Sequence, residues 1–178
     1  MPAYYKNQFR PASLGSQLPQ LSTELDSVRV YQFEVHFDGV PGIGNSAQDL
    51  TLAAKQVSPI GVDVDDIEIH RVNEIFFYPG KPKPTEVTIT FDDLYSGVSK
   101  NLYGWFKKTY DNTDGSIKSN KAQRVSIVQL DGDLNVKGST SLYGVYIKSW
   151  KESEYNYSTA NDFHTVELIL RADFADHQ

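Results

Sequence analysis

The chain has no cysteine, only one methionine and no long apolar segment. The lack of cysteine excludes a disulfide framework, a thiolate metal site and a cysteine nucleophile. No stretch approaches the roughly 18 apolar residues that a membrane-spanning helix needs, and the N-terminal segment lacks the apolar core of a signal peptide. The sequence therefore predicts a protein without a membrane partner, located in the cytoplasm of the cell that makes it.

Positive charge is also scarce. The 17 lysine and arginine residues face 23 aspartate and glutamate residues, so the formal net charge is −6. The densest basic groups are Lys81-Pro82-Lys83 and Lys107-Lys108, whereas nucleic-acid readers carry a basic stripe that neutralises phosphates. DNA is therefore excluded as a tightly bound ligand, but an acidic surface suits DNA as cargo that slides past without binding.

The 178 residues suit a single domain, and 11 Tyr, 9 Phe and 2 Trp favour β-strands. Residues 1–27 differ from the rest because they contain Pro2, Pro11 and Pro19, many Ser and Gln residues, and no sustained hydrophobic period. They are predicted to form an extended N-terminal arm, either disordered or draped over a neighbouring subunit. Residues 28–178 are predicted to form the folded domain.

Alternation of apolar and polar residues predicts strands along most of this domain. The predicted strands are residues 31–37, 50–55, 67–78, 87–92, 124–130, 136–150 and 166–174. The alternation of the strand 67–78 slips near Arg71, which predicts a bulge or bend. The segment Pro79-Gly80-Lys81-Pro82-Lys83-Pro84 is rich in strand breakers and is predicted to be a turn.

One helix is predicted in this domain. Val98, Leu102, Trp105, Phe106 and Tyr110 recur at helical spacing and would form a single apolar face. About seven or eight antiparallel strands with one helix on a face or an end define a mainly β, α+β fold. A barrel or sandwich protects the strand edges best, so the predicted fold class is an antiparallel β-barrel or sandwich with one flanking α-helix.

Two segments resemble ligand-binding loops without meeting their requirements. Gly42-Ile43-Gly44-Asn45-Ser46-Ala47 matches G-x-G-x-x-A, but a dinucleotide site needs a helix there within a βαβ unit, and the alternation after Ala47 predicts a strand. Asp131-Gly132-Asp133 begins like a calcium loop, but Val136 and Leu142 stand where that loop needs Gly and Glu, so a hairpin turn is predicted. Neither a cofactor nor a metal is expected.

No catalytic constellation is visible in the sequence. His36, His70, His164 and His177 form no H-x-H or H-x-x-x-H ligand pair, and the chain has neither a G-x-S-x-G elbow nor a P-loop. Paired acids for glycoside hydrolysis stay open at this point, because their separation in space decides that chemistry. The expectation is a protein that is not an enzyme.

The densest acidic group consists of Asp63, Asp65, Asp66 and Glu68. Four carboxylates could bind a divalent cation, but their spacing matches no known scaffold. Two interpretations remain: a solvated strand edge, or a surface that lines a channel and repels DNA by its like charge.

The order of the predicted elements resembles that of the tail tube proteins of contractile-tailed phages, which are related to the tubes of contractile injection systems. The resemblance covers about residues 30–174 and is carried by Tyr31–Phe37, Val87–Asp92, Leu102–Phe106, Tyr143–Trp150 and His164–Phe174. The chain departs from the family in one turn, because Ile147 and Lys148 follow Gly144 where the family often has a proline. The arm before residue 28 looks like an addition to the family's pattern.

The resemblance implies a homohexameric ring whose subunit sheets join into one barrel around a channel. Stacked rings would form the inner tube of a contractile tail and conduct genome DNA during ejection into the host. The implied partners are further copies of the chain, the tail sheath protein, tube-initiator or baseplate proteins and the tail terminator, with DNA as a transient cargo. The implied location is the virion tail, after assembly in the host cytoplasm.

Within this picture, stacking is expected to use Pro79–Pro84, the loop 39–48 and the arm. The first alternative is a tube-initiator or baseplate protein, or the inner tube of a contractile injection system that carries protein. A more remote alternative is a monomeric β-sandwich binding module, for example for carbohydrate, to which the abundance of aromatic residues is suited. These hypotheses differ in self-association: a tube protein assembles with further copies of itself, whereas the binding module stays monomeric.

Overall fold

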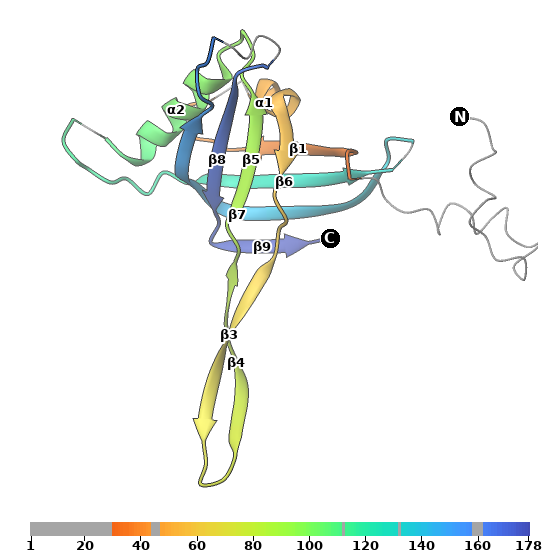
Figure 1. Ribbon diagram of the computed structural model, residues 1–178, viewed down its shortest axis with the longest axis vertical. Coiled ribbons are helices and arrows are strands. Elements are labelled where there is room, and N and C mark those ends of the chain that lie inside the picture. The colour runs from red at the N-terminus through yellow and green to blue at the C-terminus, as the bar shows by residue number, and fades with distance from the viewer. Residues whose placement is uncertain (1–29, 44–46, 112, 132, 158–161) are drawn as a thin grey trace, which may run out of the picture. The chain divides into compact units, whose positions relative to one another are not determined.

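Two helices and nine strands make up the part of the chain that the computed structural model describes, residues 30–43, 47–111, 113–131, 133–157 and 162–178 (Figure 1). The chain divides into residues 1–31 and 32–178, and all of these elements belong to the second unit. In chain order they are β1 (Phe33–Asp38), α1 (Ala47–Ala53), β2 (Ala54–Val57), β3 (Val62–His70), β4 (Ile75–Pro84), β5 (Val87–Asp92), α2 (Val98–Thr109), β6 (Ala122–Leu130), β7 (Val136–Glu152), β8 (Thr165–Arg171) and β9 (Phe174–His177).

Seven of the strands form one sheet in the order β1-β6-β7-β8-β5-β2, with β9 added beside β7. Every strand pair is antiparallel, and β3 and β4 form a separate two-stranded ribbon. The long strand β7 is shared between two parts of the sheet: its first part pairs with β6 and β9, and its second part pairs with β8. The mainly β, antiparallel class predicted from the sequence is therefore confirmed.

The strand β7 changes direction at Gly144. This residue has φ +62°, and a Cβ there would meet the carboxylate of Asp173. That carboxylate accepts hydrogen bonds from Lys121 Nζ at 2.7 and 2.6 Å. Only glycine adopts this backbone conformation without a steric cost, so Gly144 lets β1, β6 and β9 run across the strands β5 and β8 in Figure 1.

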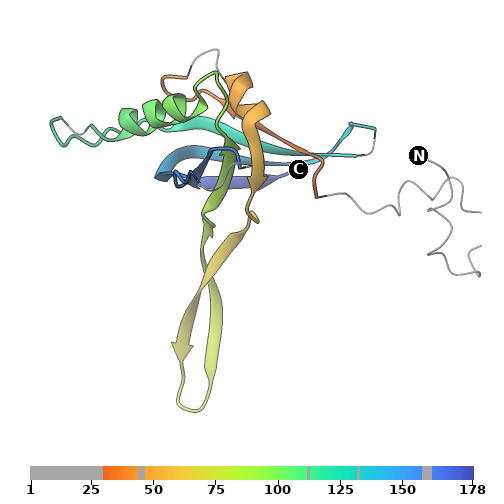
Figure 2. The same cartoon turned by 45° about the horizontal axis from the view of Figure 1, so that its top comes forward.

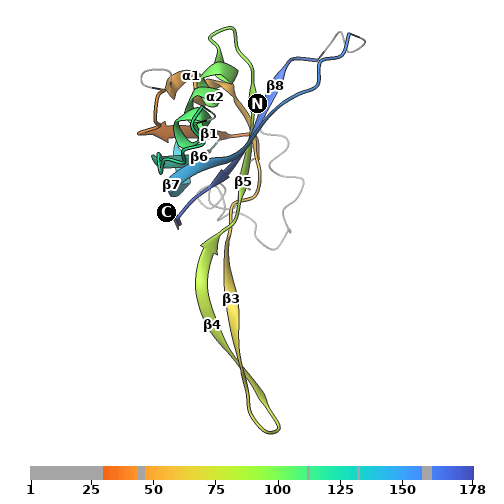
Figure 3. The same ribbon diagram turned by 90° about the vertical axis from the view of Figure 1, so that its left-hand side faces the viewer.

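The core lies between the sheet and the two helices, which are on one side of it (Figures 2 and 3). From α2, the side chains of Val98, Leu102 and Trp105 are completely buried. The sheet contributes Val35, Ile89, Phe91, Val125, Leu142, Val145, Leu168 and Leu170. Burial of each large apolar side chain contributes about 1.5–3 kcal/mol, so this cluster holds the two parts of the sheet against α2.

Two expectations about the architecture are wrong. Residues 47–53 form the helix α1, so the fold has a second helix where a strand was expected. Leu50 and Ala53, three residues apart, are buried, whereas Leu52 is 80 % exposed; over so short a segment, alternation and helical spacing share positions. The described strands also form no closed barrel, because β1 and β2 are the two ends of the sheet order.

The ribbon of β3 and β4 also differs from expectation. The predicted strand 67–78 contains the turn of a hairpin, in which the Arg71 N–H donates to the Glu74 carbonyl at 2.8 Å. The predicted turn Pro79–Pro84 is instead the second half of β4. Both strands of a two-stranded ribbon are edge strands, and edge strands tolerate proline where the missing N–H would face away from the partner.

Candidate assembly surface

The hairpin of β3 and β4 extends away from the seven-stranded sheet (Figure 3). Its nine and ten residues span about 30 Å at about 3.4 Å per residue. Among the described residues, each of these two strands pairs with the other alone. The hairpin therefore presents both of its faces outside the core.

In its outer half, next to the turn, one face of the hairpin is apolar. Residues directly opposite each other in an antiparallel pair share a face, and alternate residues of a strand lie on one side. The pairs on this face are Ile67 with Tyr78, and Ile69 with Phe76. Their side chains are exposed, from 41 % for Ile69 to 54 % for Tyr78. This set of four residues is called the apolar face below.

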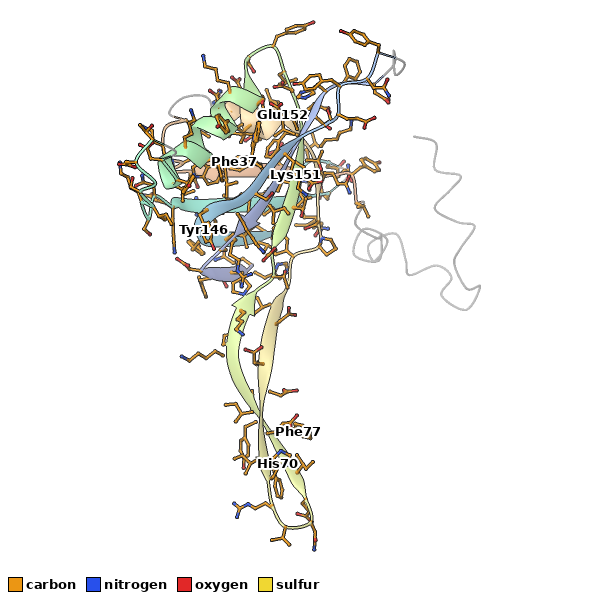
Figure 4. All side chains as sticks on the ribbon, turned by 60° about the vertical axis from the view of Figure 1, so that its left-hand side comes forward. Phe37, His70, Phe77, Tyr146, Lys151 and Glu152 are labelled. Carbon is orange, nitrogen blue, oxygen red and sulfur yellow. The ribbon has the colours of Figure 1, made fainter. Side chains whose placement is uncertain are left out.

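The opposite face of the outer half carries two of the four acids found in the sequence. The pairs on it are Asp66 with Pro79, Glu68 with Phe77, and His70 with Ile75. Figure 4 shows His70 and Phe77 toward the far end of the hairpin. Asp63 and Asp65 alternate to the other side of β3, where the Asp65 carboxylate forms an ion pair with Lys83. The structure thus divides the acidic group between two sides, and the face that carries Asp66 and Glu68 is called the acidic face below.

A β-bulge interrupts the pairing of the two strands. Between the pairs Val64–Pro82 and Asp66–Pro79, β3 has one residue, Asp65, whereas β4 has two, so the extra residue is in β4. Gly80 is one of these two residues, and a Cβ at Gly80 would be 2.5 Å from the carbonyl oxygen of Asp65. Gly80 is therefore required for the close approach of the two strands. Sequence reasoning missed this role, although a glycine within a strand is a known signal of a bulge.

The hairpin is unsuited to a monomer in water. An isolated two-stranded ribbon is at best marginally stable, and a contiguous exposed apolar surface marks an interaction site. Val72, at the turn, is 99 % exposed, and Phe77 is 61 % exposed. The hairpin is consequently a surface that another molecule would cover.

The ends of the main sheet are a second assembly feature. Within the described part of the chain, the outer edges of β1 and β2 have no neighbouring strand. Open edges expose backbone donors and acceptors that pair readily with a strand of another chain. The two edges lie at opposite ends of the sheet order, which allows each copy to contact two neighbours.

The acidic face does not have the geometry of a metal site. Alternate residues of one strand are about 7 Å apart along it, and the described residues contain no cluster of three or more His, Asp or Glu side chains that could hold an ion. His70 Nε2 lies 3.6 Å from Glu68, and Lys83 pairs with Asp65. The acidic residues of β3 are therefore a linear array of charges on the two sides of the strand.

The other loop motifs are placed as follows. Residues 44–46 of the glycine motif lie outside the described residues, and Ala47 begins α1, so a helix follows the motif where a strand was expected. The strands before and after this helix, β1 and β2, are at opposite ends of an antiparallel sheet and do not form a βαβ unit. No dinucleotide site follows from this arrangement.

The predicted turn at Asp131 is confirmed. Asp131 Oδ1 accepts hydrogen bonds from the backbone N–H groups of Asp133 and Asn135, both at 2.8 Å, between β6 and β7. The Asn135 N–H, with further hydrogen bonds, lowers the pKa of the Asp131 carboxyl below its ordinary value. The arm, residues 1–27, lies outside the described residues.

The hairpin and the open edges of the main sheet are surfaces suited to assembly. No helix among the described residues is both long and apolar enough to cross a lipid bilayer. No family model matches the sequence, and no curated protein matches it.

Solved structures nevertheless match the fold over most of the chain. A chain of the sheath–tube complex of an extracellular contractile injection system (PVC) is 19 % identical with a TM-score of 0.70, covering 92 % of this chain and 99 % of that one. A chain of the PVC sheath/tube terminator is 19 % identical with a TM-score of 0.66, covering 86 % of this chain and 97 % of that one. The SPP1 tail tube is 12 % identical with a TM-score of 0.53, covering 85 % and 79 %.

At these identities the likeness shows a shared fold. This chain has the fold of tube and tube-terminator proteins of contractile injection systems and phage tails. The resemblance predicted from the order of the strands and of the helix 98–110 is confirmed at this level. These neighbours are structural proteins, and no positive sign of catalysis appears among the described residues.

Proposed function

We propose that this chain is the subunit of a tube, in which homohexameric rings stack inside a contractile sheath. The observation that carries the proposal is the hairpin of β3 and β4, whose outer half has an exposed apolar face. A protein that functions as a monomer would bury this face, whereas a subunit of a stacked assembly leaves it to neighbouring copies. The tube fold of the solved neighbours supports the same conclusion.

The ring closes through the edges of the main sheet. The edge of β1 in one copy pairs with the edge of β2 in the next, because these are the two ends of the sheet order. Such a contact joins two different surfaces, and it closes into a ring when the rotation between copies permits. Closure by six copies, as the family resemblance implies, would make one continuous barrel.

The acidic group of the hairpin lines the channel. Asp66 and Glu68 share the acidic face, Asp63 and Asp65 precede them in β3, and the whole chain has a net charge of −6. Like charge repels phosphate, so DNA would pass without binding. The apolar face then packs against neighbouring subunits, and the segment Pro79–Pro84, the second part of β4, takes part in ring stacking.

The expected cargo is genome DNA in a phage tail, with the sheath, the initiator or baseplate and the terminator as partners. The location is then the virion tail, reached by assembly in the host cytoplasm. The alternative is the inner tube of a contractile injection system that carries protein. It is favoured by the likeness to a chain of such a system's sheath–tube complex.

Negative-stain electron microscopy of the full chain, at concentrations up to the millimolar range, tests the tube. Rings or hollow tubes of uniform width are expected. Rings that never stack on one another would favour the initiator, and a protein that stays monomeric at every concentration would contradict the proposal.

The channel role of the acidic face has its own test. Tubes carrying Asp66→Lys with Glu68→Lys should retain short labelled DNA when pelleted, whereas the unchanged tubes should not. The matched control is Asp133→Lys with Glu154→Lys, two exposed residues outside the hairpin that change the net charge equally. Equal retention by the two double variants would show that the acidic face does not line the channel.

A further inference from the structure

A cleft lies at the end of β5 that is far from the hairpin. It has a volume of about 560 Å³, within the range of ligand-sized pockets. Its apolar lining includes Leu94, Tyr95, Tyr103 and Trp150, and the last two rings pack 5.0 Å apart. Tyr95 is fully exposed at the rim. The cleft therefore offers an aromatic surface without a covering element among the described residues.

Three charged side chains also line the cleft, namely Asp93, Lys100 and Glu152. The two carboxylates are held in place by neighbours: Asp93 Oδ1 accepts from the Ser99 N–H at 3.0 Å, and Glu152 Oε1 accepts from the Ser99 hydroxyl at 2.6 Å. An ionised carboxylate has about four acceptor sites, so each retains capacity for a further donor.

The direction of β5 places the hairpin and the cleft at opposite ends of the domain. The hairpin ends at Pro84, and β5 begins at Val87; β5 ends at Asp92, next to Asp93 in the cleft. Six strand residues separate the two by about 20 Å. Figure 4 shows the same arrangement, with Glu152 near one end and His70 near the other.

The hairpin turn and the cleft are complementary in chemistry. Val72 at the apex is 99 % exposed and suits an aromatic pocket. Arg71 precedes it directly, and Glu74 follows two residues later. Arg71 can donate to the carboxylates of the cleft, and Glu74 can accept from its lysine.

We propose that the hairpin turn of one copy, residues 71–74, inserts into this cleft of a second copy in the next ring. This inference rests on the proposed tube function and adds the receiving surface for the hairpin. A contact between opposite ends of identical copies is heterologous and repeats without limit along one axis. The repeat is then the stacking of the tube, and the occupant of the cleft is the chain itself.

Cysteine cross-linking of the full chain tests this contact, because the sequence has no cysteine of its own. The variant carries Val72→Cys and Tyr95→Cys, both at exposed positions that leave the core intact. Each copy then joins the next by one disulfide, and mild oxidation should give a ladder of dimers, trimers and higher species on a denaturing gel. Disulfide formation requires Cα atoms within about 7 Å, so the ladder reports direct contact.

The matched control combines Val72→Cys with Leu134→Cys, which is 72 % exposed in the turn between β6 and β7. It should give dimers at most. Rings or tubes of the first variant without a ladder, or an equal ladder in the control, would overturn the proposed contact while leaving the tube function standing. A sample without rings and without a ladder would overturn both the contact and the tube function. Electron microscopy of the cross-linked sample shows whether rings are present and so distinguishes the two outcomes.

Discussion

Replacement of one isoleucine on the apolar face should weaken assembly without changing the fold. Ile67 is 53 % exposed in the single chain. Complete burial of such a side chain is worth about 1.5–3 kcal/mol, so covering the exposed half in an assembly is worth about 1–1.5 kcal/mol. Ile67→Thr removes most of this contribution and keeps a β-branched residue in the strand. Because 1.4 kcal/mol corresponds to a tenfold change in a dissociation constant, the protein concentration at which half of the chains are assembled should rise about five- to tenfold.

The assay is sedimentation velocity over a concentration series, with thermal unfolding of the monomer measured in parallel. The control is Ile117→Thr, the same change at a side chain that is 79 % exposed and lies outside the hairpin. Exposed substitutions of this kind alter folding stability by about 0.5 kcal/mol or less, so both variants should keep the parent Tm. An equal shift of assembly in the two variants, or no shift in Ile67→Thr, would refute the assignment of the apolar face to an interface.

Three further outcomes are expected. Gly80→Ala, whose Cβ would meet a backbone carbonyl of β3, should abolish tubes in electron microscopy at unchanged Tm, while Gly61→Ala, with only an ordinary 3.6 Å contact, should keep them. Leu168→Ala, at a completely buried position, should lower the free energy of unfolding in urea by about 2–5 kcal/mol. The pKa of Glu86 is below its ordinary 4.5, chiefly because of the hydrogen bond from Lys148. The stabilisation by the ionised Glu86 carboxylate is present above its ordinary pKa and is lost as the pH falls through the lower folded-state pKa. In urea titrations between pH 3 and 7, the free energy of unfolding of Glu86→Gln should therefore fall less at acid pH than that of the parent.

The strands of the core could be predicted from alternation because one of their faces is buried. The expected strand 87–92 coincides with β5, and the helix beginning at Val98 ends at Thr109, one residue before its predicted last apolar position. In these elements the apolar residues are where the core requires them. The sequence pattern and the tertiary structure therefore agree.

The hairpin could not be predicted in the same way, because nothing within the described chain covers its apolar face. Apolar residues follow each other from Ile75 to Tyr78 on both faces of β4, so the strand 67–78 looked continuous through its own turn. The prolines of Pro79–Pro84 then suggested a turn in a segment that is an edge strand. The acidic group was found by its density, but the β4 residues that lie opposite it depend on a bulge that periodicity alone does not place.

That bulge decides which residues lie opposite each other in the outer half of the hairpin. Without the extra residue in β4, Tyr78 would lie opposite Glu68. The bulge moves Tyr78 by one position, so that it lies opposite Ile67 and joins the apolar face. A ribbon with such a face can pack it on a neighbour without burying the charges of Asp66 and Glu68 on the opposite side. The absence of a Cβ at Gly80 makes the bulge sterically possible, and so links a local backbone feature to the assembly.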